Sequence, residues 1–436
     1  MFVLILACAG ALAGLLMRTG PRIERVVREA NDFEGALHPR PPHIGTPTTG
    51  TFARAVEPLL AEARELPEPE PDSMSRPEGE DEVASEAWSK AFQALREQCL
   101  DVTVGKLSLE KMPAPCRKAL DQGRQVMRRV LAATHAEVGG LPAGAGSLSR
   151  PSFSREPSGM RALERVVELA ALETRLLVAE GHAQEAVDVC LDSLAVSREL
   201  SLGGALHGSQ LSASSQALTY RPCAEALDKA SVERKRQALV QIGRLREGRP
   251  SFSAVLREES VFHQLTTFGP DFLPPEALSR LPPAGRTLVN AHSGWFFFTS
   301  RIGHPMLRRY LWRRNVSMFD AMAAAADLPQ GERHQAFARI DAAHTLLSDF
   351  PNAVHALEYH RQWELLAPQD VQLAALMVLV EVDISRAERG AWPAPLTPPT
   401  AEGFSLQVLN EEEALLAPHD AKLAEYALPL AADSAP

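Results

Sequence analysis

The fold of this chain is organised around residues 160–229, which begin MRALERVVELAALETRLLVAE at Met160 and continue through Gly181-His182. In the first part, apolar residues recur at steps of three and four, a spacing that gives a helix one wide apolar face. Glycine in a helix interior costs about 1 kcal/mol and commonly ends the helix, so Gly181 predicts a break. Two helices joined this tightly are expected to lie antiparallel and face to face.

The partners of this hairpin are also predicted from sequence. Its second helix has apolar residues along one side and is expected to end at Gly203-Gly204. The next segment, Leu206–Leu227, is rich in Ser, Ala and Gly, so its backbone is expected to approach the hairpin closely. Residues Pro368–Arg389 are apolar nearly all round, which predicts a helix enclosed by the others and packed on residues 160–229.

Composition favours a mainly α protein. The chain has 436 residues, a net charge of −10 and only 6% aromatic residues, and β-branched alternation is almost absent before the C-terminal region. We expect an irregular multi-helix bundle with the hairpin at its core. The alternating stretch Phe404–Leu409 predicts a strand, and hence a small β-containing C-terminal appendage. The acidic balance argues against nucleic acid as a partner, because a nucleic-acid binder needs a basic face.

Residues 1–17 form an apolar run, at the short end of the roughly 17–25 residues that cross a membrane. A signal-anchor helix, a cleaved signal peptide and a lipoprotein signal ending at Cys8 are three interpretations. No positive charge precedes the run, which argues against a signal peptide, and Leu6 fits a lipidation site poorly. We favour the transmembrane signal-anchor.

The remaining domain boundaries follow from composition. Residues 18–86 are rich in Pro and Glu, which predicts an extended linker, with one short helix possible at Phe52–Glu65. A helical domain is expected over 87–392, the β-containing appendage over 393–430 and a loose tail over 431–436.

Four cysteines lie beyond the N-terminal run. Cys99 and Cys116, and likewise Cys190 and Cys223, stand where helical hairpins bring them near each other. Two disulfides and small buried thiols are both consistent with this spacing, and disulfides require an oxidising compartment. No CxxC or Cys/His cluster is present, so no structural metal site is predicted.

No catalytic motif is found. The sequence has no HExxH, GxxxxGK[ST] or GxSxG, and the Ser-x-x-Lys spacing at Ser108–Lys111 lacks the partner motifs of a serine acylase. No cofactor is therefore predicted. The one candidate pocket combines acidic, histidine and arginine side chains from helices expected near 253–266 and 306–327; its residues are Glu258, Glu259, His263, Arg309 and Arg313.

Two stretches resemble known families. Ala179–Ala186, AEGHAQEA, resembles the turn of a tetratricopeptide repeat, as a single unit without a 34-residue recurrence. Ser385–Leu396, SRAERGAWPAPL, is similar to the G-x-[YW]-P junction of type II secretion pseudopilins, whose N-terminal processing signature this chain lacks. The order hairpin, small-residue helix, apolar helix, G-x-W-P turn and strand resembles a group of uncharacterised, N-terminally anchored helical bacterial envelope proteins.

This resemblance implies a place at the bacterial envelope, with the helical domain in the periplasm and the chain held by a single-pass helix in the inner membrane. Arg18, Arg22, Arg25 and Arg28 favour the opposite, cytoplasmic placement under the positive-inside rule. We expect a non-enzymatic scaffold or interaction protein with a protein partner. The alternative is a hydrolase or ligand-binding protein that uses the Glu/His/Arg pocket.

Overall fold

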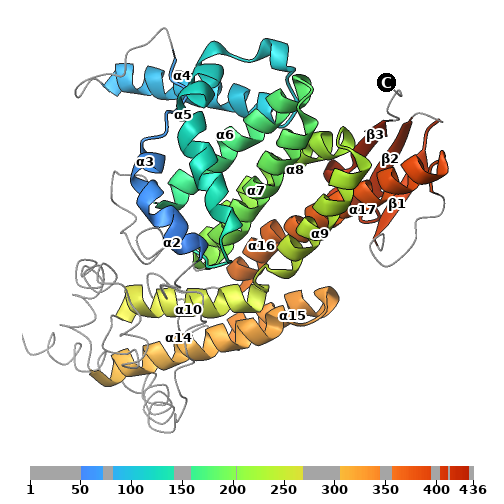
Figure 1. Cartoon of the computed structure of the whole chain (residues 1–436). Helices are drawn as coiled ribbons and strands as arrows, with labels where there is room; N and C mark the ends of the chain where they lie inside the picture. Colours follow the sequence, from blue (N-terminus) through green and yellow to red (C-terminus); the bar gives the residue numbers. More distant parts are fainter. Residues whose placement is uncertain are drawn as a thin grey trace, which may run out of the picture. The chain divides into compact units, whose positions relative to one another are not determined.

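The computed structural model describes residues 51–71, 82–141, 159–202, 204–268, 305–343, 356–393, 403–410 and 413–431 (Figure 1). The predicted signal-anchor, residues 1–17, lies outside these residues, as does most of the predicted linker. The contacts divide the chain into two units. Of the described residues, 252–268, 305–343 and 356–361 belong to the small unit, and the others belong to the large unit.

Three helices form the centre of the large unit: α6 (Gly159–Ala179), α7 (Ala183–Ser201) and α8 (Ala205–Asp228), each packed on the other two. The predicted hairpin is confirmed. The amide of Gly181, at φ +80°, donates to the Val178 carbonyl, and that of His182 donates to the Leu177 carbonyl. This pair of bonds is the Schellman ending of α6, which needs a left-handed residue and hence glycine.

The close approach of the small-residue helix is confirmed at Gly208. A Cβ atom placed on Gly208 would lie 2.4 Å from the carbonyl oxygen of Leu200 in α7. Side chains larger than hydrogen are therefore excluded where α8 begins against α7. The Ser- and Gly-rich composition of this segment thus has a steric cause.

The other elements of the large unit surround this centre (Figure 1). They are α2 (Phe52–Val56), η1 (Glu57–Leu59), α3 (Leu60–Arg64), α4 (Glu82–Thr103), η2 (Leu109–Lys111), α5 (Ala114–Ala132), η3 (Ala133–His135), α9 (Val232–Glu247), α17 (Pro368–Arg389) and η6 (Ala421–Tyr426). Helix α17 packs on α8 and α9 with most of its apolar residues buried, so its predicted enclosure is confirmed. Gly390, at φ +72°, ends it.

By length and composition, Ala356–Arg389 is the one membrane-span candidate among the described residues, at 34 residues and a mean hydropathy of 1.5. More than half of its most apolar window, 56%, is buried. The core helix of a folded domain has the same properties. Burial of α17 against α8 and α9 accounts for this hydropathy.

The C-terminal appendage is a three-stranded antiparallel sheet in the order β1-β2-β3. Its strands are β1 (Phe404–Val408), β2 (Glu413–Pro418) and β3 (Leu428–Ala431). Alternate residues of β2 and β3, among them Leu416 and Leu430, are buried. The Tyr220 hydroxyl donates to the Tyr426 carbonyl at 2.6 Å, which ties α8 to the segment before β3. The expected β appendage is present, with a third strand that the sequence patterns did not predict.

The short helix given as possible at Phe52–Glu65 is present as α2, η1 and α3, but its assignment to a linker is wrong, because residues 51–71 belong to the large unit. Phe52, Val56, Leu60 and Ala63 are buried in the core of the large unit, at 0 to 4% exposure. Their spacing of four, four and three residues gives α2 and α3 one apolar face, and that face decides the packing despite the Pro-rich flanks. The following extended residues are held as well, because Arg165 of α6 donates two hydrogen bonds to the carbonyl of Pro67.

The single helical domain predicted over 87–392 is also corrected. Residues 252–361 form a core of their own around Leu256, Phe319 and Phe337. The described helices of the small unit are α10 (Phe252–Phe268), α14 (Pro305–Ala326) and α15 (Gln330–Ala343), and α16 (Ala356–Leu366) starts there. The carboxylate of Asp341 accepts hydrogen bonds from the first amides of α16, at Ala356 and Leu357. A carboxylate there favours the helix N-terminus.

Candidate functional site

The predicted pocket residues lie in the small unit. Helix α10 carries Glu258, Glu259 and His263, and α14, which packs on α10, carries Arg309 and Arg313. Glu258 is only 2% exposed and Arg313 is half-buried. The side chain of Arg309 lies outside the described part of the chain.

Two of these residues share one aromatic cluster. The ring of His263 lies 5.8 Å from that of Phe319, and Phe319 packs edge-on against Tyr359 at 5.4 Å. Burial and the nearby carboxylate of Glu259 together raise the pKa of Tyr359. Burial lowers the pKa of His263 to about 4, so its ring is neutral at pH 7. Helices α10, α14 and α16 thus bring His263 against Phe319 and Glu259 near Tyr359.

A second group of charged side chains, which the sequence patterns did not single out, lies along α6 in the large unit. Its three carboxylates, Glu164, Glu168 and Glu173, are 7%, 6% and 3% exposed. Burying an unpaired carboxylate is strongly unfavourable, so each is expected to have cationic partners. The only sequence signal was the presence of acidic residues within an otherwise buried helix.

Glu173 is held by two arginines of α5. Arg124 makes a bidentate pair with it, with Nε–Oε1 and Nη2–Oε2 distances of 3.0 and 3.1 Å, and Nη2 of Arg128 lies 2.9 Å from Oε1. Burial alone would lower the pKa of Arg124, but the hydrogen bonds and charge of Glu173 raise it overall. These contacts fix α5 on α6 in one register.

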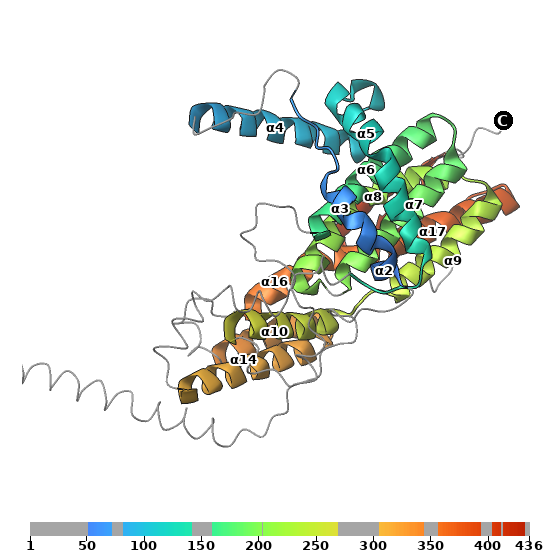
Figure 2. The same cartoon turned by 60° about the vertical axis from the view of Figure 1, so that its left-hand side comes forward.

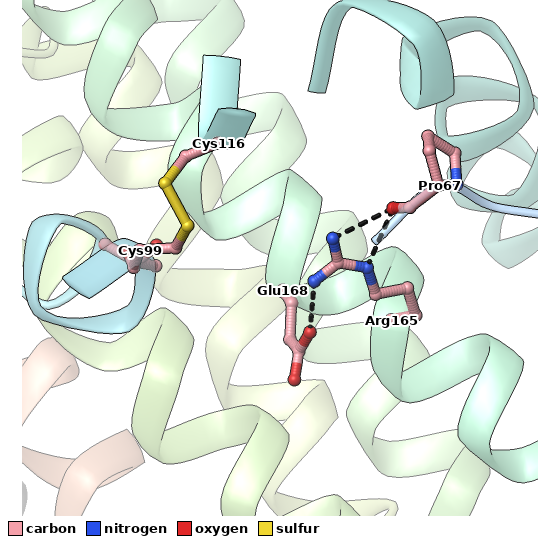
Figure 3. Close-up of a disulfide and its surroundings, with 6 residues drawn as sticks. Pro67, Cys99, Cys116, Arg165 and Glu168 are labelled. Carbon is pink, nitrogen blue, oxygen red and sulfur yellow. Dashed lines mark hydrogen bonds and ion pairs between the residues drawn. A yellow bond between two sulfur atoms is a disulfide. The ribbon is translucent and has the colours of Figure 1, made fainter. Parts of the chain in front are cut away.

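Glu168 is likewise bound by two arginines, and Figure 3 shows its contact with Arg165 and the contact of Arg165 with Pro67. Its Oε1 atom lies 2.7 Å from Nη2 of Arg96 on α4, and its Oε2 atom lies 2.6 Å from Nη1 of Arg165. Arg165 in turn binds the carbonyl of Pro67, with Nη2–O at 2.9 Å. The charge of Glu168 raises the pKa of Arg96. One carboxylate therefore fastens α4 and the extended residues after α3 to α6.

The Cys99–Cys116 disulfide lies beside this junction and links α4 to α5, with the two Cα atoms 5.7 Å apart (Figure 3). Cys99, Cys116, Arg96, Arg165 and Glu168 line one cavity of about 20 Å³. This volume is sufficient for one water molecule.

The second disulfide, Cys190–Cys223, joins α7 to α8 with a Cα–Cα distance of 5.3 Å, and both residues are fully buried. The four cysteines thus form two disulfides, one of the two alternatives that their positions in the sequence left open.

A further buried ion pair and a group of glutamine hydrogen bonds join α17 to its neighbours. Nζ of Lys235 on α9 lies 2.9 Å from Oδ2 of Asp383 on α17. Gln216 of α8 donates to the Gln369 carbonyl at 2.6 Å and to the Gln372 side chain at 2.9 Å. These residues were not predicted, because their partners come from more than a hundred positions away in sequence.

The charged side chains described above for the large unit form ion pairs with one another. The α6 carboxylates are neutralised by arginines, and Lys235 by Asp383. Within the described ranges, no group of three or more His, Cys, Asp or Glu side chains is arranged to hold a metal ion. This arrangement fastens helices together.

Comparisons with family models, with curated proteins and with solved structures found no match for this chain.

Proposed function

We propose that this protein is a non-enzymatic scaffold or interaction protein of the bacterial cell envelope, anchored by residues 1–17 with its helical units in the periplasm. The observation that carries the proposal is the pair of disulfides, Cys99–Cys116 and Cys190–Cys223. Disulfides persist in oxidising compartments such as the periplasm and are rare in the bacterial cytosol.

The pairing of the buried carboxylates with arginines of the same chain supports a scaffold and not an enzyme. An enzyme keeps polar groups available to its substrate and tunes their pKa values for that task. In the large unit, Glu168 and Glu173 are each bound by two arginines from within the chain, which strengthens the contacts between helices. A rigid helical body with extensive outer faces suits protein binding.

Two fusions after Pro436 test the location. Alkaline phosphatase is active only where its own disulfides form, so the full chain fused to it is expected to give active phosphatase, and a matched cytosolic fluorescent reporter is expected to stay dark. An inactive phosphatase with a fluorescent reporter would place the units in the cytoplasm and contradict the proposal.

The anchor and the partner have separate tests. The full chain is expected to stay with membranes through alkaline extraction, whereas a variant with residues 1–17 replaced by a cleaved secretion signal is expected to be released. Crosslinking in intact cells is expected to recover the same protein partner in replicate experiments. Failure to recover any reproducible partner would count against a scaffold.

A ligand-binding role for the small unit is the second candidate, favoured by the 2% exposure of the Glu258 carboxyl and by the neutral His263 beside Phe319. If the pocket acts on a ligand, Glu258→Ala and Arg309→Ala variants that fold normally are expected to lose the cellular phenotype of the wild type. Retention of the full phenotype by both variants would rule this role out.

A further inference from the structure

The two disulfides of the large unit differ in their surroundings. Cys190 and Cys223 are both at 0% exposure, inside the packing of α7 and α8. In the other disulfide, Cys116 is 2% exposed but Cys99 is only half-buried and borders the small cavity next to α4. Thiol–disulfide exchange requires a thiolate to reach one sulfur atom, and Cys99 is the most exposed of the four paired cysteines, so we take its sulfur as the point of attack.

The charges around this cavity favour the exchange. Arg96 stands three residues before Cys99 on the same helical face, and Arg165 lies across the cavity; the carboxylate of Glu168 binds both. Neighbouring guanidinium groups stabilise a thiolate, which makes it a better leaving group. The charges of Glu164 and Glu68 also act on Arg96, so the two guanidinium groups favour the thiolate against partly compensating carboxylates.

Helix α4 is held mainly from its C-terminal end. Among its residues with described burial, only Val102 and Thr103 are buried. Its Arg96–Glu168 pair, with an arginine side chain 45% exposed and a carboxylate side chain 6% exposed, holds α4 to α6 and not to α5. Figures 1 and 2 both show the first turns of α4 extending beyond α5 and α6. The covalent bond to Cys116 is therefore the strongest attachment of this helix to α5.

We propose that Cys99–Cys116 is a reducible latch: a dithiol opens this disulfide and frees α4 from α5, while Cys190–Cys223 and the packing of α6, α7 and α8 stay intact. In the first step, a thiolate of the dithiol bonds to the Cys99 sulfur, the bond to Cys116 breaks and the Cys116 thiolate takes up a proton. The second thiol of the reductant then displaces Cys99. The dithiol is oxidised to a disulfide, and both cysteines are reduced to thiols. The latch operates whatever partner the protein binds.

The test uses the full chain with both disulfides formed. The native protein is incubated with increasing dithiothreitol at constant pH, quenched with iodoacetamide and analysed by peptide mass spectrometry. Alkylation of Cys99 and Cys116 is expected at on the order of tenfold less reductant than alkylation of Cys190 and Cys223. Simultaneous opening of both disulfides, earlier opening of Cys190–Cys223, or no opening short of unfolding would overturn the proposal.

Hydrogen exchange distinguishes release of α4 from general loosening. After selective reduction, amides of residues 82–112 are expected to exchange faster, with those of 159–228 unchanged. A Cys99→Ser/Cys116→Ser variant provides the same state without reductant and is expected to give the same exchange pattern. If its α4 amides remain as protected as in the oxidised wild type, the disulfide does not act as a latch.

Discussion

Lys235 and Asp383 form an ion pair that is buried on both sides, with Nζ and Oδ2 2.9 Å apart and side-chain exposures of 7% and 6%. Lys235 also donates to the carbonyl of Asp228 at 2.8 Å. The pair joins α9 to α17, the helix whose enclosure completes the large unit. The neighbouring residue Arg236 pairs with Glu388 between the same two helices, at 2.7 Å, but there both side chains are about half exposed.

These two ion pairs give a matched comparison. Lys235→Met leaves a buried carboxylate without its cation, so we expect it to lower the free energy of unfolding by about 3–5 kcal/mol. Arg236→Met removes an exposed pair and is expected to change it by less than about 1 kcal/mol. Urea unfolding followed by circular dichroism measures both. Equal effects would show that Lys235 and Asp383 are solvated in the folded protein.

The double variant Lys235→Met/Asp383→Leu tests whether the stability lost in Lys235→Met comes from leaving the Asp383 carboxylate buried without its cation. Because it removes both charges, it is expected to recover most of the stability lost in Lys235→Met. Recovery of less than about 1 kcal/mol would indicate that Lys235 stabilises the protein through its bond to the Asp228 carbonyl and not through Asp383.

Substitution by alanine at two helical glycines is expected to change the stability of the protein in opposite directions. At Gly208, a methyl group meets the Leu200 carbonyl oxygen at 2.4 Å, so we expect Gly208→Ala to destabilise the protein by about 1–3 kcal/mol. At Gly243 in α9, the nearest atom is Cε of Met377 at 3.8 Å, and Gly243→Ala is expected to stabilise it by about 0.5–1 kcal/mol. Thermal unfolding compares them, and a stable Gly208→Ala protein would contradict the tight packing of α8 on α7.

The small unit is expected to lose stability as the pH falls from 6.5 to about 4. Burial lowers the pKa of His263 from 6.5 to about 4, so in this window the unfolded chain binds a proton that the folded unit does not. The stability is therefore complete above pH 6.5, and the loss approaches about 3 kcal/mol near pH 4. Hydrogen exchange of α10 amides at several pH values measures this dependence.

The His263→Phe variant provides the control for this titration, since its ring cannot take up a proton. The variant is expected to show a weaker pH dependence in α10 than the wild type, whereas His182→Gln, at the exposed hairpin turn, is expected to leave the dependence unchanged. An identical pH dependence in His263→Phe and wild type would mean that His263 titrates as an exposed histidine.

Local sequence patterns were sufficient to predict several of the helices of the large unit. The apolar steps of α6, the break at Gly181 and the nearly all-apolar α17 each follow from short-range sequence, and all three are present. The burial of Phe52 and Val56 was missed, because the Pro-rich flanks placed the possible short helix at Phe52–Glu65 within a linker and not in the core. The third strand was missed because Pro429 interrupts a run of only four residues.

The partners of the buried charged residues could not be predicted from local sequence patterns. The arginines that bind Glu173 come from positions 45 and 49 residues earlier, and the arginine that pairs with Glu168 across helices comes from 72 residues earlier. Periodicity predicts which face of a helix is buried but not which helix covers it. For the same reason, the separate core of the small unit could not be predicted.

The state of the four paired cysteines in cells tests the envelope proposal most directly. Cells are quenched in acid, the protein is denatured and labelled with a maleimide without reductant, and peptides are read by mass spectrometry. We predict that Cys99, Cys116, Cys190 and Cys223 are unlabelled and become labelled only after reduction. Labelling of all four before reduction would show that the units fold in a reducing compartment and would contradict the proposal.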